Sequence, residues 1–174
     1  MDSDIRWIFR AGTKGGFSEV ERMEYEIAFS FRDLADLSQL PNSRGAFRGV
    51  VGAGYPDLRA SQLPLRISQL YWFVHRMAPA DRILHIDERL EIAHEGTVAS
   101  RYRYVPDGGP FFNRRAVRWT SSRSFDDTPS KLTELWRGQT GIIPVGSLSR
   151  LEAGAPDSLD GVLLGQVRPG TVSG

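Results

Sequence analysis

The residues best suited to chemistry lie in one stretch, residues 98–119, which reads VASRYRYVPDGGPFFNRRAVRW. Tyr102 and Tyr104 are two residues apart, so an extended chain places both rings on one face. A Pro- and Gly-rich loop follows them, and after it come two more aromatic residues and two arginines: Phe111, Phe112, Arg114 and Arg115. Aromatic rings beside arginines favour a surface that stacks on bases and contacts phosphates. The alternative is that the phenylalanines pack beneath the loop and the arginines are solvated.

The sequence predicts a protein without catalytic activity, metal or cofactor. The glycine-rich stretch GTKGG lacks the spacing of a P-loop, although its backbone N–H groups and Lys14 could still contact one phosphate; the alternative is a simple tight turn. The three histidines have no paired metal-binding spacing, and the acidic cluster near residue 88 is typical of a solvated turn. No nucleophile motif or nuclease motif is present.

Composition limits the class of protein further. The chain has 174 residues, which is enough for one domain with its own core, and no cysteine, which excludes disulfides and thiol chemistry. Its 22 basic and 21 acidic residues leave a net charge of +1, so any contact with nucleic acid must be a local patch. Neither a signal peptide nor a membrane span is evident, which predicts a soluble cytoplasmic protein.

Hydrophobic periodicity predicts a mixture of short strands and helices. Expected strands are residues 5–9, 27–31, 82–86, one or two within 90–104, and 114–119. Expected helices are residues 17–26, capped by Ser18, residues 65–77 with an apolar stripe, and residues 130–138, capped by Ser130. Residues 42–56 contain four glycines and are expected to be weakly helical at best.

This order of elements predicts one α+β domain over residues 1–146, in which a mixed sheet curls into a partly open barrel flanked by helices. The last 28 residues, 147–174, are rich in Gly, Ser, Pro and Asp and are expected to form a flexible tail or a linker to an effector domain.

Five segments resemble, in their order and spacing, the N-terminal modules of Mrr-like and McrB-like restriction proteins. They are WIFRAGTKGG, IAFSFRDLADLS, ISQLYWFVHRMAPAD, SRYRY and RRAVRW. Those modules are similar to the EVE and YTH-like branch of the PUA superfamily, and the likeness covers about residues 5–145. It implies a curled β-barrel that binds a modified base, methylated adenine or cytosine, flipped out of DNA into an aromatic cage.

The resemblance also implies roles for individual residues. The family usually has a tryptophan at the end of the second strand as one wall of the cage, and here Phe29 or Phe31 occupies that place. Ser30 and Asp33 could bond the base edge, while Tyr102, Tyr104, Phe111 or Phe112 would supply the second wall. The residues expected to contact phosphate are Arg10, Thr13, Lys14, Arg32, Arg114 and Arg115.

The partner implied is therefore DNA that carries a modified base, and the chain would be the specificity part of a restriction or phage-defence system. A nuclease or AAA-type effector domain would perform the reaction. Two alternatives stay open: an RNA-binding PUA-type module that uses the same patch, and a sensor domain for a protein or small ligand without salt-dependent affinity for nucleic acid.

Overall fold

The computed structural model describes residues 5–10, 20–22, 24–29, 34–87, 90–107, 111–130, 132–134 and 141–145. Its strands are β1 (Ile5–Arg10), β2 (Val20–Arg22), β3 (Glu26–Phe29), β4 (Arg82–Asp87), β5 (Ile92–Val98), β6 (Arg103–Tyr104), β7 (Asn113–Ser124) and β8 (Gly141–Pro144). The helical elements are η2 (Leu37–Gln39), α1 (Arg44–Gly54), α2 (Leu63–Tyr71), η3 (Trp72–Arg76) and η4 (Phe125–Asp127).

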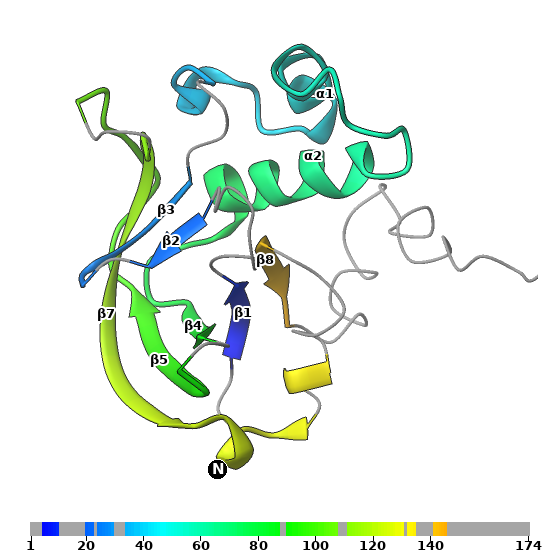
Figure 1. The fold of residues 1–174 in the computed structure, drawn as a ribbon. Helices are drawn as coiled ribbons and strands as arrows, with labels where there is room; N and C mark the ends of the chain where they lie inside the picture. The colour runs from blue at the N-terminus through cyan, green and yellow to red at the C-terminus, as the bar shows by residue number, and fades with distance from the viewer. Residues whose placement is uncertain are drawn as a thin grey trace, which may run out of the picture.

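The strands form one strongly curled sheet with the order β2-β3-β7-β5-β4-β1-β8, and β6 pairs with β7 beside this path. Strand β7 is the longest described strand, and its two segments pair with different strands. Residues 113–116 pair with β3, and residues 117–124 pair with β5. The sheet is mixed, because β1 and β4 run parallel while the other pairs are antiparallel. Figure 1 shows the resulting half-barrel with α1 and α2 at one end. The predicted α+β architecture is confirmed.

Alternation along the strands gives the sheet a core on each face. In β4, Ile83 belongs to the larger core, which lies against the helices, whereas Leu84 and Ile86 belong to the smaller core on the other face. A strand that is buried on both sides reads as a continuous apolar run, which explains the sequence RILHI. The predicted strands at β1, β3, β4, β5 with β6, and β7 are confirmed, whereas β8 was not anticipated.

Helix α1 contradicts the expectation that residues 42–56 are weakly helical at best. It spans Arg44–Gly54, and the side chain of Ser43 caps it by accepting a hydrogen bond from the backbone N–H of Ala46 at 3.4 Å. Phe47 and Val51, one turn apart, are fully buried in the larger core. Burial of this apolar stripe outweighs a glycine penalty of about 1 kcal/mol per residue.

The predicted helix 65–77 is confirmed, and it begins two residues earlier as α2. Its last turn, η3, is a π-helix, in which the backbone hydrogen bonds join residues that are five apart instead of four. The N–H of Met77 donates to the carbonyl of Trp72 and closes this turn at 2.8 Å. The predicted apolar stripe is buried at Ile67, Leu70, Phe73, Val74 and Met77.

The predicted helix over residues 17–26 is wrong where the structure describes it. Val20–Arg22 forms β2, which pairs antiparallel with β3, so pairing with a distant strand overrides the local helical pattern. In the predicted helix 130–138, Ser130 and residues 132–134 are helical, and Leu132 is buried in the smaller core. Residues 131 and 135–138, and the predicted tail 147–174, lie outside the described residues.

Candidate nucleic-acid interface

The hairpin formed by β6 and the start of β7 carries the aromatic residues that the sequence singled out. Tyr104 pairs with Asn113 across the hairpin, and the N–H of Val105 donates to the carbonyl of Phe112 at 2.7 Å. The rings of Tyr104 and Phe112 lie against each other, with centroids 6.1 Å apart and planes at 32°. Tyr104, Phe111 and Phe112 are all half-buried.

The arginines of this hairpin are held by a glutamate from the neighbouring strand. Arg103 and Arg114 lie directly opposite each other in the β6–β7 pairing, an arrangement that would be repulsive by itself. Glu26 of β3 accepts from both, from Arg103 through Oε1 and from Arg114 through Oε2 at 3.0 Å. Arg114 also donates through Nε to the carbonyl of Phe111 at 2.9 Å. The predicted phosphate ligand Arg114 is therefore engaged at the base of the hairpin.

Tyr102 connects the hairpin to the segment before α1. Its hydroxyl donates to Oδ1 of Asn113 at 2.6 Å and accepts from the N–H of Leu37 at 3.1 Å. Asn113, which is fully buried, donates in turn to the carbonyl of Phe29 at 3.4 Å. Burial raises the pKa of Tyr102 above the ordinary tyrosine value, so the hydroxyl keeps its proton. Tyr102 thus positions the hairpin, and its hydroxyl is not directed at solvent.

Replacing Tyr102 with phenylalanine tests this anchoring role. The change leaves the buried Oδ1 of Asn113 without its donor, and an unsatisfied buried polar group costs about 1–3 kcal/mol. We expect the free energy of unfolding, measured by urea denaturation, to fall by that amount. Tyr104→Phe is the matched control, because the hydroxyl of Tyr104 has no partner among the described hydrogen bonds of the hairpin. It should change the free energy of unfolding by less than about 0.5 kcal/mol. Equal effects from the two variants would contradict the anchoring role.

The structure contradicts the predicted phosphate-binding role of Arg115. Its side chain is only 1% exposed and donates to three backbone carbonyls: Phe73 at 2.6 Å, Val74 at 3.0 Å and Ser100 at 3.0 Å. Burial lowers the pKa of its guanidinium to about 10. Alternation along β7 explains the burial, because Arg115 shares a face with Val117 and Trp119.

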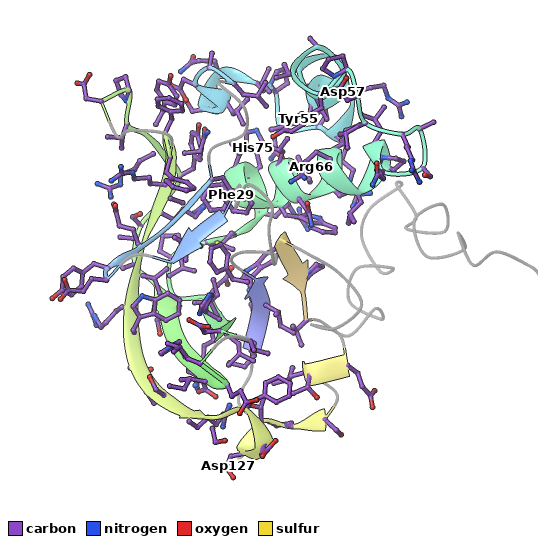
Figure 2. All side chains as sticks on the ribbon, viewed as in Figure 1. Phe29, Tyr55, Asp57, Arg66, His75 and Asp127 are labelled. Carbon is purple, nitrogen blue, oxygen red and sulfur yellow. The ribbon has the colours of Figure 1, made fainter. Side chains whose placement is uncertain are left out.

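The structure also contradicts the role of Phe29 as a wall of a base-binding cage. Its side chain is 0% exposed and packs against Phe73, with centroids 4.7 Å apart, and edge-on against Phe9 at 6.0 Å. Figure 2 shows Phe29 at the end of β3 that lies next to α2. A ring enclosed by the core has no free face for a base.

The remaining predicted residues lie outside the described part of the chain. They are Thr13, Lys14, Ser30, Phe31, Arg32 and Asp33, together with the side chain of Arg10. The structure therefore brings Tyr102, Tyr104, Phe111, Phe112 and Arg114 together on one hairpin.

Two residues that matter here, Glu26 and Asn113, were not singled out from the sequence. Glu26 adjoins the strand IAFSF, so its place on a strand could have been found, whereas its pairing with β7 depends on tertiary structure. Within the described residues, no group of three or more His, Asp or Glu side chains could hold a metal ion. The described residues likewise contain no helix that is both long and apolar enough to cross a bilayer.

A family model described as a domain of unknown function, DUF8426, matches residues 20–137 of this chain. The chain belongs to the DUF8426 family. The matched segment of this DUF8426 protein runs from β2 to the residues after η4, so it includes the hairpin and both helices. No curated protein and no solved structure matches the chain.

Proposed function

We propose that this protein is a nucleic-acid-binding module that recognises a modified base in DNA. The observation that carries the proposal is the hairpin, which brings the half-buried Tyr104, Phe111 and Phe112 together beside Arg103 and Arg114. Stacking on an aromatic ring is worth roughly 1–3 kcal/mol per base and is available to any base. Arg103 and Arg114 share the single carboxylate of Glu26, so together they leave one net positive charge beside the rings.

Because Phe29 is buried, it is excluded from the residues of the predicted aromatic cage that can contact a base. The half-buried Tyr104, Phe111 and Phe112 are then the candidates for the stacking surface, and Phe31 stays a prediction. A methyl group on a base changes binding by only about 1–3 kcal/mol, so most of the affinity must come from stacking and phosphate contacts. The curled sheet supports this function by analogy, because it matches the architecture that the restriction-protein resemblance implies.

In this proposal the chain binds without catalysing a reaction. A nuclease or AAA-type effector would act on the DNA once the modified base is bound, in a cytoplasmic restriction or phage-defence system. Incubation of modified and unmodified duplexes with the protein and Mg²⁺ should leave both intact.

Titrations of hairpin variants by fluorescence anisotropy test the proposal. The ligands are matched DNA duplexes with N6-methyladenine, with 5-methylcytosine and without modification, and an RNA of the same sequence. We expect the protein to prefer one modified duplex, and Tyr104→Ala or Phe112→Ala to weaken that complex by about 1–3 kcal/mol. Tyr104→Phe keeps the ring and is the matched control. Circular dichroism establishes that each variant is folded.

The outcomes separate the candidate functions. Equal affinity of the wild type for modified and unmodified DNA, with no effect of either alanine variant, would refute recognition of a modified base at this hairpin. Tighter binding to RNA would favour the RNA-binding alternative. Absence of any salt-dependent affinity for nucleic acid would favour a protein or small-ligand sensor.

A further inference from the structure

Positive charge in this protein is concentrated in its helices. Residues 44–76, from the start of α1 to the end of η3, contain five arginines and one acidic residue, Asp57. We call this segment the helical layer. Its net charge is +4, whereas the whole chain has +1, so the other residues together carry a net charge of −3. Such segregation creates a local positive field on a nearly neutral protein.

The arginines of the helical layer fall into two groups. Arg44 lies over the rings of Tyr71 and Trp72, at 6.0 and 5.8 Å, and Arg66 lies over Tyr55 at 5.3 Å. These two are engaged with aromatic rings of the layer itself. The side chains of the other three are exposed and form no ion pair within the described part of the chain: Arg48, Arg59 and Arg76.

The outer face of α1 carries exposed glycines around one of these arginines. Gly45 and Gly52 are three residues before and four residues after Arg48, so all three share a side of the helix. Gly49 is exposed as well, and a Cβ at Gly49 or at Gly52 would meet no atom within 4 Å. A polymer could therefore approach the backbone of α1 closely while it contacts Arg48.

The helical layer lies at the same end of the molecule as the aromatic hairpin. Figure 1 shows α1 and α2 beyond the end of the half-barrel toward which the hairpin also extends, with η2 between them. Tyr102 joins η2 to this hairpin through the N–H of Leu37. One elongated ligand could thus contact both surfaces.

We propose that the helical layer binds the sugar-phosphate backbone of duplex DNA next to the base that the hairpin holds. This inference rests on the proposed function, to which it adds the surface that supplies most of the electrostatic affinity. The contacts with phosphate come from Arg48, Arg59 and Arg76. They replace the predicted contacts of Arg115, which is buried, and of Arg114, which is paired with Glu26.

The surface chemistry favours nucleic acid over a lipid membrane. Amphipathic helices that lie on a bilayer bury large apolar side chains between the lipids. The exposed large hydrophobic residues of the described chain are Tyr25 and Leu90, and both lie outside the helical layer. A surface with exposed arginines and glycines but no exposed large apolar side chain suits a hydrophilic polyanion.

The first test removes the three arginines together as Arg48→Gln, Arg59→Gln and Arg76→Gln, and follows binding to a modified and an unmodified duplex at several salt concentrations. Each phosphate contact contributes about −0.9 to the slope of log K against log salt concentration. Loss of three contacts should therefore reduce the magnitude of the slope by about 2.7. Both duplexes should be weakened by the same factor, because phosphate contacts carry no information about the base. Arg118→Gln is the control, since Arg118 is an exposed arginine of β7 outside the layer. Its slope should stay close to that of the wild type.

The second test changes charge at one open position of α1. Gly49→Glu and Gly49→Gln introduce side chains of the same size and similar helix propensity, so both variants should fold. We expect Gly49→Glu to bind both duplexes more weakly than Gly49→Gln, with a difference that disappears at high salt.

The outcomes distinguish this inference from the proposed function. An unchanged salt slope in the triple variant, or equal binding by the two Gly49 variants, would overturn the phosphate-binding role of the helical layer even if the hairpin variants lose their preference for the modified base. If the triple variant loses salt dependence as expected but the wild type shows no preference for the modified duplex, the helical layer would still bind phosphate and recognition of the base would be refuted. Binding of the wild type to phosphatidylserine vesicles but to neither duplex would overturn both proposals.

Discussion

Replacing Arg115 with methionine is expected to lower the free energy of unfolding by about 3 kcal/mol or more, and the melting temperature by roughly 6–12 °C. The carbonyls of Phe73 and Val74 lie in the last turn of the helix, where no further helical N–H can reach them. The N–H of Ala78 instead donates to Asp81 at 2.8 Å. Arg115 is thus the donor that satisfies these two carbonyls and also that of Ser100.

Thermal denaturation followed by circular dichroism measures this effect, with Arg115→Lys as the companion variant. Lysine keeps the positive charge but cannot span three carbonyls with the fork of a guanidinium, so its stability should lie between those of the wild type and Arg115→Met. A phosphate ligand would behave differently. Its loss would weaken DNA binding and leave the melting temperature unchanged, and this result would return Arg115 to the role predicted from the sequence.

Phe29→Ala is expected to destabilise the protein by about 3–5 kcal/mol, the usual cost of removing a large aromatic side chain from a core. The ring of Phe29 contacts Phe9 and Phe73, which belong to β1 and η3, so its loss leaves a cavity between the sheet and the helices. Urea denaturation monitors the change. The same method applied to Phe29→Leu should give a smaller loss, because leucine fills part of the space.

Phe112→Ala is the matched control for this experiment, because it also removes a phenylalanine ring. Since Phe112 is half-buried at the hairpin, we expect its removal to cost less than about 1 kcal/mol of stability and to act mainly on binding. If Phe29→Ala instead kept the wild-type stability and abolished the preference for modified DNA, the ring would be part of the cage after all.

The elements that the sequence predicts well are those whose pattern is local. The stripe over 65–77 and the alternation of RILHI identify a helix and a strand, because residues next to one another in sequence determine the buried face. Helix α1 and strand β2 were not predicted correctly, since the burial of Phe47 and the pairing with β3 depend on parts of the chain that are distant in sequence.

Residue type alone predicts the site less well than the fold, because position along a strand decides whether a side chain is buried. Arginine is usually exposed, so residue type alone predicts that Arg115 contacts phosphate. The alternation in RRAVRW places Arg115 on the same face of the strand as Val117. This periodicity therefore predicts that Arg115 is buried. In the same way, Phe29 shares a face with the buried Ile27. The bridging role of Glu26 could not have been predicted, because it requires β3 and β7 to be neighbours.

The position of β1 within the sheet affects how this protein should be produced for study. The segment matched by the family model, residues 20–137, omits β1 and β8, although β1 pairs with β4 along one edge and with β8 along the other. A fragment cut at those limits would keep the pairing of β4 with β5 but would leave the edge of β4 that faces β1 without a partner, on a strand that contains Ile83, Leu84 and Ile86. Long apolar strands with a bare edge recruit the edges of other molecules and aggregate. Expression limits that keep residues 5–145 retain both neighbours and protect that edge.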